Sequence, residues 1–454
     1  MTSEAEEKLR AGGMSRASAA RHAARFAELQ SALRAAGGDP SRAARYVVPG
    51  RIEVLGKHTD YAGGRSLLCA VERGFTLVAV ARDDARMRIL DARTMELAES
   101  EIGPAMEAPP RHWSTYPFTV ARRMARDFPA LSSIRGADIA FASDLPRAAG
   151  VSSSSALVVA TFLALADVNE LRALPDFTTH IADSEHLAGY LGAVENGWSF
   201  GDLAGDTGVG TLGGSEDHTA ILCARPNELV QYTFRPVEFE RAVPLPDGYS
   251  FTIGVSGVRA EKTGAARERY NRASRALSVI VEVWRRETGR SDQTAAAALE
   301  SSPSALAELH AILERADTTG TGFTPAQLLT RLDHFVVESE ELIPAASEAL
   351  SRGDLGAFSD IVRRSQERAE RLLANQTPET IELARSATEL GAVAASAFGA
   401  GFGGSVWALI STADEEEFLR RWERNYRARF PARTPDDDGS FFTTRAGPPA
   451  MRID

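Results

Sequence analysis

Residues 50–64 read G-R-I-E-V-L-G-K-H-T-D-Y-A-G-G and join a strand-like beginning to a Gly-Gly end. Between these two parts lie a cation, an imidazole and a carboxylate, which are Lys57, His58 and Asp60. Polar groups this dense on an irregular segment are typical of a site that a rigid scaffold presents to a small ligand. The segment therefore predicts a binding site for a polyhydroxylated molecule rather than a part of the hydrophobic core.

A second segment, residues 145–157, reads L-P-R-A-A-G-V-S-S-S-S-A-L and leads into an apolar helix. Small residues at a helix start leave the first-turn amides accessible to an anion, and the helix dipole adds positive potential there. A plain serine N-cap is the alternative interpretation. We expect a phosphate site that consists of Gly150, Val151, Ser152, Ser153, Ser154 and Ser155.

A third segment, residues 398–409, reads F-G-A-G-F-G-G-S-V-W-A-L. Three of its glycines satisfy G-x-G-x-x-G, but this pattern follows a helical stretch and precedes a strand, which is the reverse of a dinucleotide-binding turn. Residues 50–58 likewise lack the spacing and the Ser/Thr of a Walker loop. Neither classical nucleotide-binding fold is predicted.

In this order, the three segments resemble the signatures of the galactokinases, a branch of the GHMP small-molecule kinases whose first signature usually reads G-R-V-N-L-I-G-E-H-T-D-Y-N-G-G. The resemblance implies an α+β fold of two domains with the active site in the cleft between them. It also implies an ATP-dependent sugar kinase that phosphorylates the anomeric hydroxyl of galactose or a closely related hexose, with Mg²⁺. A non-catalytic sensor of sugar and ATP is the alternative from another class.

The resemblance assigns roles to individual residues. Residues 213–219, G-G-S-E-D-H-T, resemble the family's C-G-I-M-D-Q, so that Asp217 would be the catalytic base and Arg51 would keep it ionised. A structural ion pair is the alternative for Arg51, and Glu216 is expected to be an exposed neighbour. The sugar-binding residues would be Lys57, His58, Asp60, Gly214 and Tyr270.

For the nucleotide, the resemblance implies that Gly401 and Gly403 help to shape the phosphate site, with a packed glycine turn as the alternative. Magnesium prefers oxygen ligands, and Ser154 would supply a hydroxyl and Glu195 a carboxylate. Glu185 is the competing carboxylate.

One position departs from the family form. Where galactokinases have a glutamate that hydrogen-bonds the hydroxyl on carbon 6 of the sugar, this chain has Lys57. A buried lysine would suit an anionic substituent, which favours a hexuronate such as galacturonate or glucuronate as an alternative substrate. Otherwise Lys57 turns outward or pairs with an acidic neighbour, and the sugar is neutral. Lys262, in a longer stretch before Tyr270, could reach a phosphate or an acidic sugar.

Composition limits the remaining possibilities. A chain of 454 residues is longer than one hydrophobic core usually supports, so two domains are expected. They are 1–235 and 236–454, with the boundary in the range 225–250. A net charge of -11 argues against nucleic acid as a partner. The longest apolar stretch, 156–166, is too short to span a bilayer. The acidic first residues and only two cysteines favour a cytoplasmic protein without disulfides, and no protein partner is implied.

Periodicity and turn residues predict the elements. Residues 1–45 are expected to be helical up to Gly37-Gly38, and short strands follow from residue 46. Further strands are expected near 139–142, 218–223, 229–235 and 250–256, in 406–410 and at 440–444. Helices are expected at 116–127, twice within 155–195, through most of 268–390 and at 414–428, and residues 201–214 are expected to form a loop.

Overall fold

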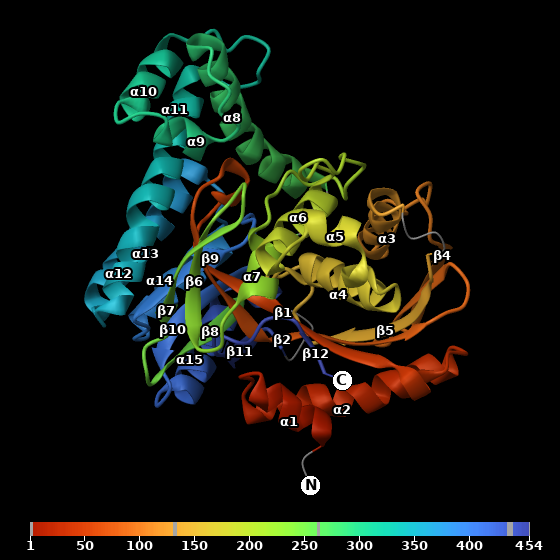
Figure 1. The fold of residues 1–454 in the computed structure, drawn as a ribbon. Helices are drawn as coiled ribbons and strands as arrows, with labels where there is room; N and C mark the ends of the chain where they lie inside the picture. The colour runs from red at the N-terminus through yellow and green to blue at the C-terminus, as the bar shows by residue number, and fades with distance from the viewer. Residues whose placement is uncertain (1–2, 130–133, 261–263, 434–438, 454) are drawn as a thin grey trace.

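The computed structural model describes residues 3–129, 134–260, 264–433 and 439–453, and it has the expected α+β fold. The strands of these residues form two sheets (Figure 1). The first has the order β12-β1-β2-β5-β3-β4, and the β6–β7 hairpin pairs with β2. Its strands are β1 (Ala44–Leu55), β2 (Ser66–Ala81), β3 (Arg86–Asp91), β4 (Glu96–Glu101), β5 (Ala137–Ser143), β6 (Glu228–Thr233), β7 (Glu238–Pro244) and β12 (Met451–Arg452).

The second sheet is antiparallel and has the order β11-β8-β10-β9. Its strands are β8 (Tyr249–Val255), β9 (Ala394–Phe398), β10 (Ser405–Ser411) and β11 (Phe441–Thr444). The helices are α1 (Glu4–Ala11), α2 (Arg16–Ala35), α3 (Thr115–Asp127), α4 (Ser153–Val168), α5 (Pro175–His180), α6 (Ser184–Asn196), α7 (Glu216–Cys223), α8 (Gly264–Thr288), α9 (Ala295–Glu300), α10 (Ala305–Arg315), α11 (Pro325–Val336), α12 (Ile343–Ser351), α13 (Leu355–Arg368), α14 (Pro378–Glu389) and α15 (Glu415–Arg429).

Helices cover both faces of the first sheet. Along β1, Val47 packs in one hydrophobic cluster with the residues of α2, while Tyr46 and Val48 pack in another with those of α4. Successive side chains of a strand point to opposite faces, so a sheet covered on both sides reads as nearly continuous apolar runs. This burial explains why β1 and β2 contain so few polar positions.

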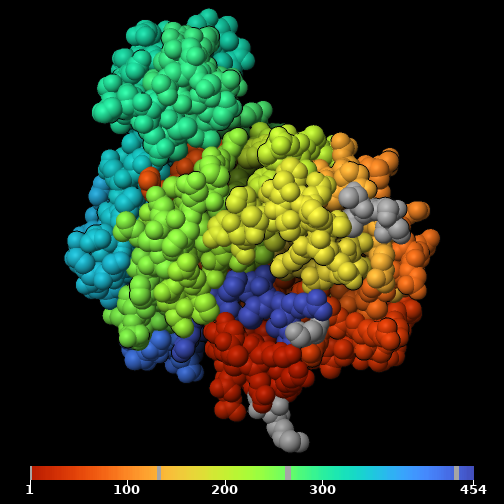
Figure 2. Space-filling model, viewed as in Figure 1, coloured from red at the N-terminus to blue at the C-terminus, as the bar shows by residue number. Residues whose placement is uncertain are grey.

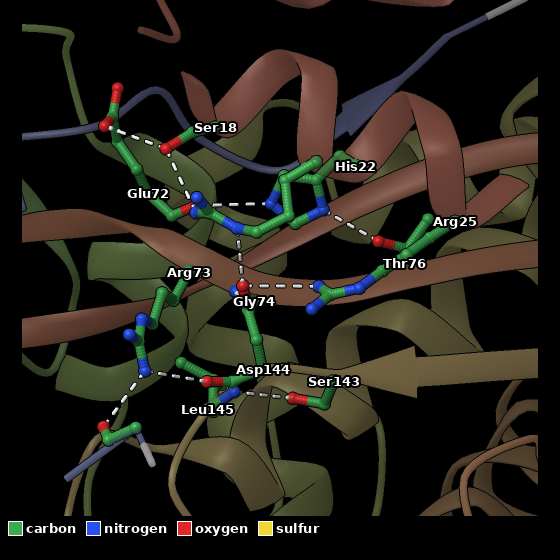
Figure 3. A network of polar contacts seen from close by, with 12 residues as sticks. Ser18, His22, Arg25, Glu72, Arg73, Gly74, Thr76, Ser143, Asp144 and Leu145 are labelled. Carbon is green, nitrogen blue, oxygen red and sulfur yellow. Dashed lines mark hydrogen bonds and ion pairs between the residues drawn. The ribbon is translucent and has the colours of Figure 1, made fainter. Parts of the chain in front are cut away.

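Polar contacts anchor α2 on its face of the sheet (Figure 3). The His22 Nδ1 lies 2.7 Å from the Thr76 hydroxyl, the Ser18 hydroxyl donates to Glu72 at 3.1 Å, and Arg25 pairs with Asp144. Burial lowers the pKa of His22 to about 4, so this imidazole is neutral in the fold. The N-terminal helices are therefore an integral layer of the domain.

Helices α8 to α11 form a separate packed group with a core of their own, which includes Leu277, Trp284, Leu309 and Phe335. Figure 2 shows this group projecting from the remainder of the molecule. Helices α13, α14 and α15 pack against the second sheet. Within the described ranges, no helix is both long and apolar enough to cross a membrane.

The structure departs from the expected helices and strands at two places. Residues 218–223, expected as a strand, belong to α7, whose first turn contains Glu216 and Asp217. Residues 235–236, where the two expected domains meet, lie between the paired strands β6 and β7, and β12 returns the end of the chain to the first sheet. The division into two domains at this point stays a prediction. The β3–β4 hairpin was not foreseen. Both cysteines are free thiols, as expected.

Candidate active site

A cavity of about 570 Å³ contains most of the expected site residues. Its walls come from β1, from the loop before α4, from α6 and α7, and from the glycine-rich turn after β9. Residues far apart in the sequence therefore meet here, among them Arg51, Ser154, Asp217 and Gly399. The cavity lies where elements of both sheets come together.

Arg51 and Asp217 form an ion pair in the lining of this cavity, with Arg51 buried and Asp217 partly buried. The Arg51 Nε donates to Asp217 Oδ1 at 2.8 Å, and Nη2 lies 2.6 Å from the same oxygen. The Nη1 group donates to the Gly150 carbonyl at 2.6 Å, which ties the pair to the serine segment. Burial works against the charge of Arg51, but Asp217 and Glu216 outweigh it and raise its pKa. The guanidinium is therefore permanently charged beside the carboxylate.

The serine segment presents its small groups to the cavity. Ser152 adopts a left-handed conformation with φ 61°, and α4 begins at the next residue. The Ser152 hydroxyl is buried and has no hydrogen-bond partner among the described residues. Gly150 and Ser152 to Ser155 all line the cavity, whereas Val151 does not. An unpartnered hydroxyl beside free helix-start amides fits an anion.

Ser155 connects Glu195, the expected magnesium ligand, with Asp217, the expected base. Its hydroxyl lies 2.9 Å from Glu195 Oε2 and 3.2 Å from Asp217 Oδ2. His218, which the sequence analysis did not single out, places its Nε2 3.0 Å from the same Glu195 oxygen. Glu195 lines the cavity, while Glu185, the competing carboxylate, does not and instead accepts a hydrogen bond from Tyr232.

Asp60 and Gly214 lie together at the other end of the cavity. The Asp60 carboxylate accepts a hydrogen bond from the backbone N–H of Glu216 at 3.2 Å. A Cβ atom on Gly214 would come within 2.2 Å of Asp60 Oδ2, so that no larger residue fits this position. Tyr270 lines the same end, with its ring centroid 5.0 Å from that of His58.

His58 lines the cavity with both ring nitrogens already engaged. Nδ1 lies 3.0 Å from the Tyr61 hydroxyl, and Nε2 lies 3.0 Å from the Ala400 carbonyl. Burial and the nearby Arg331 lower the pKa of His58 to about 3, so the ring is neutral. The neutral ring donates from Nε2 to the carbonyl and accepts at Nδ1. His58 therefore offers its ring surface, not a free N–H, to a ligand.

Lys57 faces away from this cavity. Its side chain is fully buried, it is not among the lining residues, and Nζ donates to the Ser365 hydroxyl at 3.1 Å. Ser365 in turn donates to Glu338 Oε1 at 2.9 Å. Lys57 was expected to contact the sugar. Its position near Glu338 and Glu53 instead agrees with the alternative interpretation, in which the lysine has acidic neighbours.

The expectation that Glu216 is exposed was wrong. Helix α7 packs its first turn inward, and Glu216 is 5% exposed. The Ser66 hydroxyl donates to its Oε2 at 2.7 Å. Glu216 and Glu53 both line the cavity. Nothing in the local sequence distinguished these glutamates from surface ones, because their burial depends on elements distant in the chain.

The third segment contributes other residues than those expected. Gly399 and Ala400 line the cavity, whereas Gly401 packs against Asn375 and Gly403 against Val258. Part of the cavity lining is aromatic. It consists of Phe75, Trp113, Tyr116 and Phe141, which sequence analysis missed. Lys262 lies outside the described residues.

Three family models match the chain. The galactokinase galactose-binding signature matches residues 34–82, the GHMP kinases N terminal domain matches 115–198, and the GHMP kinases C terminal domain matches 346–428. The first of these contains Arg51 and the 50–64 segment, and the second contains the serine segment and Glu195. The matched regions therefore contain Arg51, the serine segment and Glu195, whereas Asp217, Gly214 and Tyr270 lie between the second and third matches.

Proteins of known identity agree with these matches. The chain is 27% identical over 397 residues to the galactokinase of Chloroflexus aggregans, covering 87% of this chain and 90% of the relative. It is 25% identical over 393 residues to that of Streptomyces coelicolor, covering 84% and 88%. The structure of Lactococcus lactis galactokinase complexed with galactose has a TM-score of 0.74 at 21% identity, covering 94% of this chain and 99% of that one. Methanococcus jannaschii mevalonate kinase has a TM-score of 0.53 at 12% identity, covering 89% and 99%.

The matched models and the site together indicate the class, a small-molecule kinase of the GHMP type. The galactose-binding signature then selects one branch of this class. The matches to this signature and to both GHMP kinase domains, with the similarity to galactokinases over most of the chain, indicate an ATP-dependent sugar kinase.

Proposed function

We propose that this kinase transfers the γ-phosphoryl group of ATP to the anomeric hydroxyl of galactose or a closely related neutral hexose. The observation that carries the proposal is the Arg51–Asp217 pair, which lies in one cavity with the serine segment on one side and Asp60 with Gly214 on the other. The names of the relatives and the galactose in the Lactococcus lactis structure support galactose as the sugar.

In this proposal Asp217 accepts the proton of the attacking hydroxyl, and Arg51 holds the carboxylate ionised and in place. Phosphoryl transfer depends mainly on positioning and on neutralised charge, so one carboxylate and one guanidinium suffice beside the phosphates. The amides at the start of α4 and the serine hydroxyls would bind the phosphates. The aromatic part of the lining, with Trp113 and Phe141, would hold the nucleotide base.

The donor groups near Asp217 also suit Mg²⁺. Glu195 supplies a carboxylate at the cavity wall, and Ser154 lines the same wall with its hydroxyl. Oxygen ligands of this kind, completed by phosphates and water, are what magnesium prefers. When bound, the ion would neutralise charge on the phosphates. We therefore assign Ser154 and Glu195 as its protein ligands.

On the sugar side, Asp60, Tyr270 and the backbone of Gly214 would bind the hydroxyl groups, and His58 would pack against the ring. The lining of this end favours a neutral sugar, since Glu53, Asp60, Glu216 and Asp217 outnumber Arg51. A hexuronate is the weaker candidate, because the Lys57 ammonium that would attract its carboxylate is directed to Ser365.

Sugar-dependent release of ADP tests the proposal. We expect ADP release with Mg²⁺, ATP and galactose, and a far lower kcat/KM with galacturonate or glucuronate. A preference for either hexuronate would replace the neutral sugar as substrate. Binding of sugar and ATP without any ADP release would instead favour the sensor alternative.

A further inference from the structure

Two buried glutamates lie directly behind the Arg51–Asp217 pair. Glu53 follows Arg51 by two residues in β1, and Glu216 precedes Asp217 in α7. They are 3% and 5% exposed. The family forms quoted above have asparagine and methionine at these positions, so this carboxyl pair is a feature of this chain rather than of the family signature.

The contacts of the two carboxyl groups leave one oxygen without a conventional donor. Glu53 Oε2 accepts from the Gly399 N–H at 3.2 Å, and Glu216 Oε2 accepts from the Ser66 hydroxyl at 2.7 Å. Glu53 Oε1 is buried and receives no hydrogen bond from an N–H or hydroxyl of the described residues. The carboxyl group of Glu53 does, however, lie within hydrogen-bond reach of the carboxyl group of Glu216. Two carboxyl groups hydrogen-bond only if one of them carries a proton.

The charges around the pair also require a proton. Glu53 faces Arg51, Lys57 and Glu338 in addition to Glu216. Glu216 faces Arg51, Asp60 and Asp217 in addition to Glu53. Arg235 faces Asp60. Three cations thus stand against five carboxyl groups in a buried volume, where unpaired like charges are costly. Burial raises the pKa of Glu53 to about 7 and that of Glu216 well above its usual range, in the same direction as the geometry.

We propose that Glu53 and Glu216 share one proton, and that this singly charged pair is a positioning element which keeps Arg51 on Asp217. Arg51 Nε lies 2.8 Å from Asp217 Oδ1 and 3.8 Å from Glu216 Oε1, so the guanidinium has two acidic neighbours on one side. Loss of the shared proton adds a negative charge beside Glu216 and draws Arg51 away from Asp217. The proposal rests on the kinase function assigned to Arg51 and Asp217.

The pH profile of kcat tests the pair. We expect the kcat of the natural chain to fall as pH rises, over a range of about pH 6 to 9, when the shared proton is lost. In Glu53→Gln the amide N–H permanently replaces the shared proton, so this fall, relative to the variant's own maximum, should be absent. Glu216→Gln should remove it as well. Glu185→Gln, a glutamate outside the cavity, is the matched control and should retain the fall.

The outcomes are separable. If the natural chain releases no ADP with any sugar, the proposed function fails. If the natural chain is active and the pH profile of kcat is the same in Glu53→Gln as in the natural chain, the proton-sharing pair is refuted. Infrared difference spectroscopy gives a readout independent of activity, because a protonated carboxyl has its own C=O band. That band should disappear with rising pH in the natural chain and should be missing in both glutamine variants. If both glutamine variants show the band, the proposal is refuted.

The pH dependence of unfolding provides a further check. A carboxyl pair whose pKa is raised in the native state binds more protons than the unfolded chain, so stability falls as pH rises from the ordinary glutamate range toward the raised pKa. Glu53→Gln should make the fall of the melting temperature over this range shallower than in the natural chain and in Glu185→Gln. An equal slope in all three proteins would contradict the shared proton.

Discussion

The two ends of the cavity use charge in different ways. The phosphate end is built from the Gly150 to Ser155 segment and the start of α4, where backbone amides and hydroxyls face the cavity. The sugar end contains Glu53, Asp60 and Glu216 around Asp217, and Arg51 lies beside these acids. One end is prepared for anions and the other repels them.

This contrast separates two kinds of sequence signal. Amides at a helix start are positioned by a local turn, so that a short motif is enough to predict them. An ionisable side chain acts according to the neighbours that fold against it, and Lys57 and His58 are adjacent in sequence yet face Ser365 and the cavity respectively. The predictions below address the boundary between the two ends and then each end in turn.

Asp217→Asn should cause the largest loss, because the residue lies where the two ends meet. Removal of a general base lowers kcat by about 10³-fold. Sugar affinity, measured by calorimetry, should remain close to that of the natural chain, since Asp60 and Gly214 are untouched. Asp202→Asn, at an exposed position, is the control and should keep full activity. A kcat within a factor of about 10 of the natural chain would exclude Asp217 as the base.

Arg51→Met should lower kcat by about 10²-fold, because a preorganised charge beside the transferred group is lost. It should also shift the acid limb of the kcat/KM profile to higher pH, since the cation beside Asp217 favours its ionised form. The pH profile thus distinguishes a role in the reaction from a purely structural ion pair. An unshifted acid limb would indicate that Arg51 does not act through Asp217.

The fold and the phosphate end could be predicted from the sequence more fully than the sugar end. The serine segment predicted a helix start, and α4 begins at Ser153. By contrast, residues 218–223 have strand-like composition and form α7, because packing against α4 and α6 outweighs their weak propensity. The burial of Glu53 and Glu216 results from contacts with Gly399 and Ser66, which no local pattern encodes.

Glu195→Gln tests the phosphate end alone. A neutral amide is a poorer magnesium ligand than a carboxylate, so the Mg²⁺ concentration needed for half-maximal rate should rise by about 10-fold. The KM for the sugar should change little. Glu185→Gln serves as the matched control on the same helix, α6, and should leave the Mg²⁺ requirement as it is. An identical requirement in both variants would remove Glu195 from the metal site.

Lys57→Met tests the layer behind the sugar end, and its effect should be the smallest because no reacting group is changed. Methionine keeps most of the buried volume but leaves Ser365 without its ammonium donor and removes one of the two cations that face Glu53, which should lower stability by about 2 kcal/mol. Lys8→Met, at an exposed lysine, is the control for denaturant unfolding. The ratio of kcat/KM for galactose to that for galacturonate should be the same in Lys57→Met as in the natural chain. A loss confined to galacturonate would mean that the ammonium reaches the substrate, and the charge of the sugar end would then have to be reassigned.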